Sequence, residues 1–402
     1  MNKCGKTMTT RGYVYQVDTT NLYTNKSSPR TSYYHGKFKT PELLLPRANS
    51  RCRDEEMNTS YMRMCFAKYR DMIRNKEYEN VIESLANFIT LEPAVEIRSE
   101  CVPPPIAPVD CSKYKHTFGN GVRKVTKEPR IGILIQLGFD VEMLEVYLNE
   151  VYDVIDKFFI TESVVTHSNR QTRKPLMWER VKEQPRFKKF RDKVVHFIVD
   201  DAGRNRPTGD IWVSEFTQER LRWEKFLEWN NKAKFFGEDD IIGFGDTDEI
   251  PSRNSIAVLR QCTGSFTSID IGSMFLFGDD DAPFISDFPI RGHRFHYGDP
   301  TFFSLQSAKK YAQTKHKYPS RQRGRSPSYI IGGTHISPYS YMPFILNKQL
   351  VATERTPADF PLMGIEEMEE YFARLEPDRY RSRIRSFKNV RKEIGKDRKS
   401  VV

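Results

Sequence analysis

Hydrophobic residues fall into short runs from residue 130 onward, and amphipathic stretches separate these runs. Four runs of strand length are rich in Ile, Val and Phe: 131–137, 155–161, 194–199 and 241–244. Residues 141–151 and 215–229 place their apolar side chains on one helical face, and a third helix is expected over 251–262. Strands that alternate with helices predict an α/β fold, with a mainly parallel, Rossmann-like sheet flanked by helices.

Residues 1–127 have a weaker pattern and predict a partly helical N-terminal extension. Apolar residues recur at helical spacing at Met62, Cys65, Phe66, Tyr69, Met72 and Ile73. The sequence VPPPIAP over 102–108 is typical of a polyproline linker. We therefore expect a main domain over 128–373, followed by a basic helical tail over 374–402.

The composition of the 402 residues is that of a folded protein. Apolar residues make up 38% and aromatic residues 12%, which excludes a disordered chain. No apolar run has the length of a membrane-spanning helix, and the first residues show no secretory signal. The six cysteines form no CxxC pair, so we do not expect a Cys-rich zinc site. Because no signal is found, we expect a cytoplasmic location with mostly reduced thiols; the alternative is a disulfide or two in the N-terminal part.

The net charge of +11 is concentrated in two segments. Residues 309–325 carry seven basic and no acidic side chains, and residues 374–399 carry eleven basic and four acidic ones. The rest of the chain is therefore at 11 − 14 = −3, which argues against a dedicated nucleic-acid-binding domain. We expect the first segment to be a loop, either solvated or handling phosphate charge, and the second to be a solvated tail or a weak contact to an anionic membrane surface.

The sequence Asp246-Thr-Asp-Glu249 directly follows the fourth predicted strand. Ligands of parallel sheets bind at the carboxyl ends of the strands. On an extended backbone, Asp246 and Asp248 point to the same side and can both reach one hard cation, Mn²⁺ or Mg²⁺, which would hold a diphosphate. The alternative is a solvated acidic turn before the next helix.

A second candidate is Gly332-Gly-Thr-His335. Paired glycines allow close backbone approach to a ligand, and a histidine can bind a metal or a phosphate oxygen. The alternative is a turn with a packed histidine.

Five segments together resemble glycosyltransferase family 17, between residues 130 and 361. They are LEVYLNE (144–150), VIDKFFITES (154–163), KPL (174–176), the helix 215–223 with Glu219-Arg220, and GDTDEIPSR (245–253). The sequence GTHIS over 333–337 is similar to a later Gly-x-His-x-Ser stretch of that family.

The resemblance implies a GT-A-like fold and an inverting, metal-dependent glycosyltransferase. Its sugar donor would be a UDP-sugar, UDP-GlcNAc, and its acceptor a glycan that receives a β-1,4 linkage. The metal ligands would be Asp246, Asp248 and His335; the sugar donor would be bound by Glu162, Arg220, Asp246, Gly333 and His335. The base that takes the acceptor proton would be Glu249, Glu215 or Asp270, and Trp212 and Trp223 would either stack on a sugar or be buried.

Two other functions stay open on the residues alone. A metal-dependent hydrolase of nucleotide sugars would use the same carboxylates with water as the attacking species. A binding module would use the basic loop and tail on nucleic acid or another anion. Eukaryotic members of the family are Golgi membrane proteins, so the resemblance makes the Golgi the alternative location.

Overall fold

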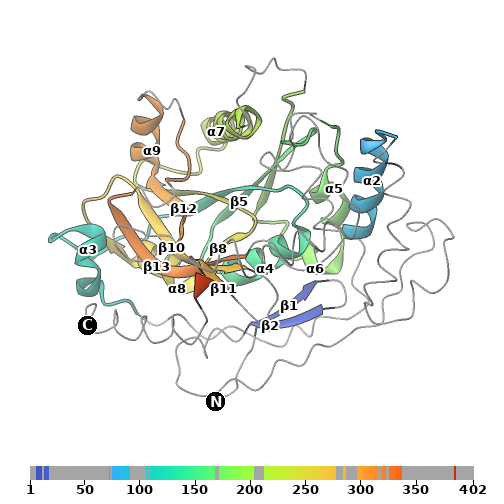
Figure 1. Ribbon diagram of the computed structural model, residues 1–402. Coiled ribbons are helices and arrows are strands. Elements are labelled where there is room, and N and C mark those ends of the chain that lie inside the picture. Colours follow the sequence, from blue (N-terminus) through green and yellow to red (C-terminus); the bar gives the residue numbers. More distant parts are fainter. Residues whose placement is uncertain are drawn as a thin grey trace.

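One curled sheet with helices on both faces forms the centre of the computed structural model (Figure 1). The structure describes residues 106–336 apart from 107, 168–171, 203–211, 278–283, 287–296, 315–317 and 323–325, together with 6–10, 13–17, 72, 75–90 and 384–385. The expected α/β class is confirmed. None of the helices in these ranges has the length and apolar character that crossing a membrane requires.

Four parallel strands make up one half of the sheet. In the spatial order β6-β5-β4-β7 they are Val194–Val199, Lys157–Ser163, Ile131–Gln136 and Ile241–Asp246. The chain runs outward from β4 through β5 to β6 and then crosses to β7 on the other side of β4. The topological switch point therefore lies between β4 and β7, where Gln136 is level with Asp246.

The second half of the sheet is mixed, and the sequence pattern did not predict its strands. β12 (Tyr297–Ser304) runs antiparallel to β7, and β10 (Ile269–Phe277) runs antiparallel to β12. β13 (Ser328–Ile336) lies parallel to β10 and antiparallel to the short β8 (Glu249–Pro251). β11 (Phe284–Ser286) and β14 (Ile384–Arg385) complete the edge of the sheet. The two residues of β14 belong to the tail that was expected to be helical, so they are in a strand and not in a helix.

Two small sheets lie apart from the main one. They pair β1 (Lys6–Thr10) with β2 (Tyr13–Val17), and β3 (Arg123–Lys124) with β9 (Cys262–Thr263).

The helices form two layers (Figure 1). On one face lie α2 (Tyr78–Ile89), α4 (Val141–Val151), α5 (Met177–Val181), α6 (Pro185–Lys188) and α8 (Arg253–Gln261). On the other lie α7 (Val213–Ala233) and α9 (Leu305–Ala312). A 3-10 turn, η2 (Cys111–Tyr114), and α3 (Lys115–Phe118) precede β3. Because α9 contains Lys309 and Lys310, the loop expected over 309–325 is in fact a helix in its first residues.

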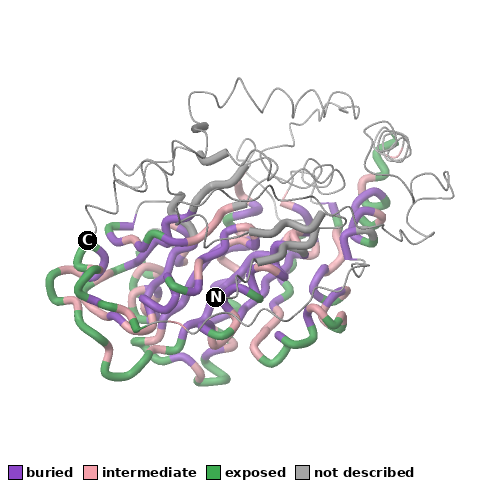
Figure 2. The backbone as a smooth tube through the Cα atoms, turned by 90° about the horizontal axis from the view of Figure 1, so that it is seen from below, coloured by how far each residue is buried: buried purple, intermediate pink, exposed green. Residues whose placement is uncertain are grey.

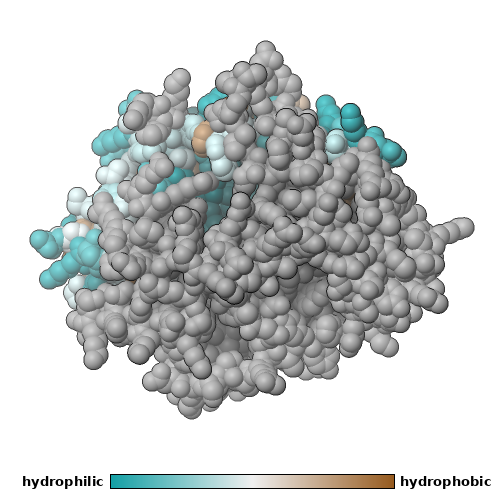
Figure 3. Space-filling view, in the orientation of Figure 1, coloured by the Kyte–Doolittle hydropathy of each residue, from teal (hydrophilic) through white to brown (hydrophobic). Residues whose placement is uncertain are grey.

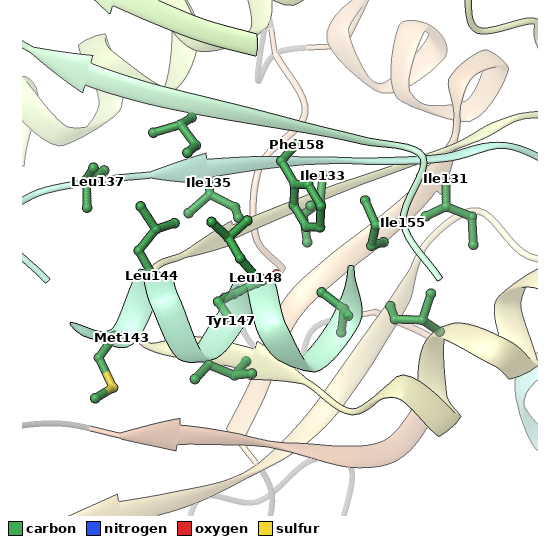
Figure 4. Packing of buried hydrophobic residues seen from close by; sticks show 14 of the residues in the cluster. Ile131, Ile133, Ile135, Leu137, Met143, Leu144, Tyr147, Leu148, Ile155 and Phe158 are labelled. Atoms are coloured by element: carbon green, nitrogen blue, oxygen red, sulfur yellow. The ribbon is translucent and has the colours of Figure 1, made fainter. Parts of the chain in front are cut away.

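The core follows the periodicity of the sequence. Leu144, Tyr147 and Leu148 of α4 point toward Ile133 and Ile135 of β4, and all are fully buried (Figure 4). Burying an aliphatic side chain of this size contributes about 1.5–3 kcal/mol. Buried residues are concentrated along the strands (Figure 2). The opposite face carries a second cluster, in which Trp223 and Phe226 of α7 stack with centroids 5.4 Å apart.

Parts of the expected N-terminal extension share the main core. Ile82 and Ile89 of α2 and Phe118 of α3 belong to the same cluster as Ile133. The helix expected from Met62 to Ile73 lies outside the described residues apart from Met72. The boundary at 127/128 stays a prediction, although side chains on both of its sides pack together.

A disulfide joins Cys111 of η2 to Cys262 at the end of α8, across 151 residues of sequence. The expectation of reduced thiols is therefore wrong for this pair. The bond ties the segment before the sheet to the helix that follows the site described below.

Glu162, near the end of β5, is a second anchor of the fold. Its side chain is fully buried, and it accepts hydrogen bonds from the backbone N–H groups of Met177 (2.6 Å) and Trp178 (2.9 Å) at the start of α5. Lys174 Nζ (3.4 Å) and His196 Nε2 (3.0 Å) also face this carboxylate. Burial lowers the pKa of the Lys174 ammonium, and Glu162 opposes that change. These contacts explain the burial of the Glu162 carboxylate by its partners within the protein, with no need for a bound nucleotide.

We expect the disulfide to stabilise the fold by restricting the unfolded chain. Replacing both cysteines (C111S/C262S) should lower the free energy of unfolding by roughly 2–5 kcal/mol, as measured by urea denaturation. Reductant should lower the midpoint of the parent protein by more than it lowers that of the double variant. Equal midpoints for the parent protein with and without reductant would contradict the bond.

We expect Glu162→Gln to act on stability, because it leaves the Lys174 ammonium buried without its carboxylate. The free energy of unfolding should fall by about 3–5 kcal/mol in chemical denaturation. The control is Arg220→Ala, which removes an exposed i,i+4 ion pair with Glu224 and should change stability by at most about 0.5 kcal/mol. A Glu162→Gln protein as stable as the control would contradict the anchor.

Candidate active site

The residues Asp246 to Glu249 form a tight turn between two strands. β7 ends at Asp246, Thr247 and Asp248 make the turn, and β8 begins at Glu249. Glu249 Oε2 accepts the N–H of Asp246 at 2.9 Å, and Thr247 Oγ1 donates to the carbonyl of Gln136 at 2.7 Å. The expected extended backbone is therefore wrong, and the two aspartates face different basic side chains. Asp246 binds Arg321, whereas Asp248 Oδ2 lies 3.6 Å from His335 Nε2.

Arg321 is the centre of a carboxylate cluster at this edge. Its guanidinium side chain is 4% exposed and donates to Glu249 Oε1 at 2.8 Å, to Glu215 Oε1 at 2.8 Å and to Glu219 Oε1 at 3.3 Å, as well as to Asp246. Glu215 and Glu219 come from the first turns of α7, and the other two carboxylates come from the β7–β8 turn. One planar cation thus joins the helix layer to the edge of the sheet.

A second arginine, Arg222 of α7, lies beneath this cluster and is fully buried. It donates to the carbonyls of Leu134 (3.3 Å) and Gly245 (3.1 Å), and its Nη2 is 3.9 Å from Glu219 Oε1. Four carboxylates therefore meet two guanidinium groups, which leaves 4 − 2 = 2 negative charges when all are ionised. Such an excess in a buried site favours a proton or a further cation.

The pKa shifts follow from burial and from these charges. Burial raises the pKa of Glu215 and of Glu249, and the Arg321 guanidinium opposes the rise in both. Burial alone would lower the pKa of Arg321, but the surrounding carboxylates outweigh it and hold that pKa well above its ordinary value. Arg321 is therefore a permanent cation, and Glu215 and Glu249 are the groups whose charge can change.

The segment that carries Arg321 is fixed at several points. Tyr318 packs against the second hydrophobic cluster. The N–H of Gln322 donates to Thr301 Oγ1 at 2.8 Å, and that hydroxyl donates to Asp270 Oδ1 at 2.7 Å. Asp270 Oδ2 accepts the N–H of Ser326 at 3.1 Å. The fully buried Asp270 thus holds both the strand neighbour Thr301 and the chain that follows Arg321.

A second group of buried polar side chains adjoins the cluster at the ends of β4, β5 and β6. Gln136 donates to Gln218 Oε1 at 2.8 Å, and Gln218 donates to both oxygens of Asp201 at 3.2 Å. Ser163 Oγ donates to Asp201 Oδ1 at 2.7 Å. Within the described part of the chain, Gln136 Oε1 has no hydrogen-bond partner. Sequence reasoning noted Asp201 but missed Gln136 and Gln218; the position of Gln218 one turn after Glu215 was the available signal.

The candidate Gly333 lies in β13, where space is tight. A Cβ there would come within 2.8 Å of Ser273 Oγ and 2.9 Å of the Ile250 carbonyl. The close approach that this glycine allows is therefore between β13 and its neighbours β8 and β10. His335, two residues on, is level with Glu249 of β8, which brings its ring beside Asp248.

The remaining candidates lie at varied distances from the cluster. Arg220 points outward and pairs with Glu224 at 2.5 Å, and Trp223 is buried in the second hydrophobic cluster, whereas Trp212 is only half-buried. The structure therefore brings together Asp246, Glu249, Glu215, Asp248 and His335. Asp270 touches the cluster through the segment that carries Arg321.

The residues present fit a hard cation in charge and only partly in geometry. Across the described ranges, no three His, Cys, Asp or Glu side chains converge closely enough to hold a metal ion together. Asp248 and His335 form a pair of suitable ligand atoms, and Asp246 is engaged by Arg321. The carboxylates at this edge outnumber the two guanidinium groups, which is compatible in charge with a divalent ion.

Seen from the side of Figure 1, the visible surface of the described residues is mostly hydrophilic (Figure 3). No broad apolar patch appears among them on that face; of the large hydrophobic side chains described, Ile198, Phe216 and Ile331 are exposed singly.

Part of the chain that forms this site is similar to a known protein family. Residues 108–273 match the model of "Glycosyltransferase family 17". The β-1,4-mannosyl-glycoprotein 4-β-N-acetylglucosaminyltransferases of Rattus norvegicus and Homo sapiens are each 26% identical over 133 residues, which is 32% of this chain and 23% of theirs. The chain thus spans about a quarter of the length of these relatives.

Among solved structures, a 4-diphosphocytidyl-2C-methyl-D-erythritol synthase aligns with 52% of this chain and 90% of its own at 10% identity. Its TM-score of 0.29 is too low to inform the fold. The matched region contains β4 to β8, α7 and the acidic turn. It therefore includes all four carboxylates that bind Arg321, namely Glu215, Glu219, Asp246 and Glu249. Over residues 108–273, this chain is therefore similar to glycosyltransferase family 17.

Proposed function

We propose that this protein is an inverting glycosyltransferase that moves GlcNAc from UDP-GlcNAc to a hydroxyl of a glycan acceptor, with Mn²⁺ or Mg²⁺ as its cofactor. The observation that carries the proposal is the cluster of four carboxylates, three of them buried, and two buried arginines at the switch point of the sheet. The cluster lies at the sheet edge where α/β folds bind ligands. The family match and the named relatives of the chain also support sugar transfer.

The cation would be held by Asp248 and His335, with the diphosphate of the sugar donor supplying further oxygen ligands. When bound, it would offset the negative charge that develops on the leaving diphosphate. Asp246 would join these ligands on release from Arg321. The charge excess of the cluster supports this assignment.

The nucleoside of the sugar donor would bind to the buried polar side chains that adjoin the carboxylate cluster. Gln136, Gln218 and Asp201 present amide and carboxylate groups at the ends of three parallel strands. The acceptor oxygen of Gln136 that has no partner within the described residues could take an N–H from a base. Glu162, Arg220 and Gly333 have other contacts, so their proposed roles in binding the sugar donor are indirect.

We assign the general base to Glu215 among the three candidates. Its side chain is 10% exposed, against 1% for Glu249, and Asp270 is fully buried with both oxygens hydrogen-bonded. An acceptor hydroxyl must reach the base within hydrogen-bond distance, which favours the most accessible carboxylate. Glu215 would take the proton of the acceptor hydroxyl while the oxygen of that hydroxyl attacks the anomeric carbon. The bond between the sugar and UDP breaks in the same step, and UDP leaves.

The disulfide between Cys111 and Cys262 bears on location. Disulfides persist in oxidising compartments and are rare in the cytosol. We therefore propose that the protein works in a secretory compartment such as the Golgi, in place of the cytoplasm expected from the sequence.

The cofactor assignment is tested by ligand-induced stabilisation. UDP-GlcNAc with Mn²⁺ should raise the Tm of the parent protein, whereas either ligand alone should raise it less. Asp248→Asn and His335→Gln should each abolish the metal-dependent part of this rise. Asp239→Asn, an exposed carboxylate of the α7–β7 loop, is the control and should respond like the parent protein.

A Tm rise with UDP-GlcNAc that is equal with and without Mn²⁺ would contradict the metal assignment. A larger rise with another nucleotide sugar would reassign the sugar donor.

The activity itself is tested by transfer to a glycan bearing a free hydroxyl. We expect Glu215→Gln to lower kcat by about 10²–10⁴-fold, because general base catalysis typically contributes that much. Asp239→Asn again serves as the control. Release of free GlcNAc from UDP-GlcNAc at a rate that no acceptor improves would instead indicate a hydrolase.

A further inference from the structure

We propose that Arg321 is a positioning residue of the site, and that Asp270 and Thr301 act through it. The inference rests on the proposed glycosyl transfer and adds to it the group that sets the geometry of the carboxylates. Arg321 comes from the basic segment 309–325, which the sequence alone suggested as a phosphate-binding loop.

The guanidinium of Arg321 contacts carboxylates from two parts of the fold. Arg321 bonds two carboxylates of the β7–β8 turn through Nη1 and two of α7 through Nη2 and Nε. Its side chain is 4% exposed, so a phosphate in solvent would reach little of it. The planar fork fixes directions as well as charge, which a lysine ammonium cannot do.

The backbone beside Arg321 is held by hydrogen bonds to neighbouring strands. The backbone N–H next to it, that of Gln322, is held by Thr301 Oγ1 at 2.8 Å. The Thr301 hydroxyl has only one hydrogen, and it points to Asp270 Oδ1 at 2.7 Å, which leaves its lone pairs to accept from Gln322. Asp270 and Thr301 are paired in register on β10 and β12, and both are fully buried. A path of hydrogen bonds therefore runs from the interior of the sheet to the carboxylates.

The position of Arg321 affects the position of the proposed base. Glu215 is the proposed base, and Arg321 Nη2 holds one of its oxygens at 2.8 Å. A shift of the Arg321 backbone moves the guanidinium and turns Glu215 with it. Misplacement of a reacting group by about 1 Å can cost on the order of 10²-fold in rate. Loss of the path should therefore lower kcat, with little change in KM for the sugar donor.

The test compares Thr301→Val, which removes the hydroxyl and keeps the shape, with Thr301→Ser, which keeps the hydroxyl. We expect Thr301→Val to lower kcat by about 10-fold with KM for UDP-GlcNAc within about 2-fold of the parent value, and Thr301→Ser to restore kcat. Arg321→Lys should lower kcat by about 100-fold, because it keeps the charge and loses the fork.

A matched control separates positioning from stability. Ser304→Ala, in the same strand, removes the hydroxyl that accepts the N–H of Ser307 at 3.1 Å at the start of α9, away from the cluster. It should lower the Tm as Thr301→Val does and leave kcat unchanged. Equal kcat for Thr301→Val and the parent protein, or a change in KM alone, would overturn the proposal.

Hydrogen exchange gives a readout that does not depend on transfer. Peptides containing Gln322 should exchange faster in Thr301→Val than in Thr301→Ser or Ser304→Ala, because the Gln322 N–H loses its acceptor. Unchanged exchange in Thr301→Val would overturn the path. Absence of any transfer by the parent protein, together with the expected exchange pattern, would reject the glycosyltransferase and keep the positioning role of Arg321.

Discussion

The ion pairs of Arg321 are the constraint on which the arrangement of the site depends. Four carboxylates cannot share a buried volume unless positive charge lies among them, because each would repel the others at low dielectric. Arg321 and Arg222 together supply half of the compensating charge. The two guanidinium groups allow the cluster to form, and they leave part of its negative charge to be balanced by a proton or a further cation.

The topology of the sheet explains why the carboxylates meet where they do. β7 lies beside β4 at the switch point, and β12 brings Thr301 against β7 from the other side. Gly245 makes this approach feasible, since a Cβ there would lie 2.9 Å from Pro300 Cβ and 3.4 Å from Glu249 Oε2. Backbone packing at one glycine thus decides how near Glu249 comes to the turn that holds Asp246.

The sequence predicted the parallel half of the fold because its signals are local. β4 is buried along its whole length and is a continuous apolar run, and α4 shows regular helical spacing with the bounds that were expected. β12 and β13 were missed because YGDPTFFS and SYIIGGTHI interrupt their apolar residues with Gly, Pro, Thr and Ser. Of the site, the acidic turn, Glu215 and His335 were predictable from motifs. The bonds of Arg321 to residues 72 to 106 positions away have no local pattern, so only the folded chain reveals them.

The late position of Arg321 in the chain has a consequence for biosynthesis. All strands of the parallel half, and all four carboxylates of the cluster, precede residue 250, so they leave the ribosome well before Arg321 does. Domains generally fold from the N-terminus during synthesis. The nascent parallel half would then hold its acidic residues without their main counter-ion until β12 and the segment after α9 arrive. Completion of the site is in this way coupled to completion of the sheet, and truncated translation products would lack the cation that assembles the carboxylates.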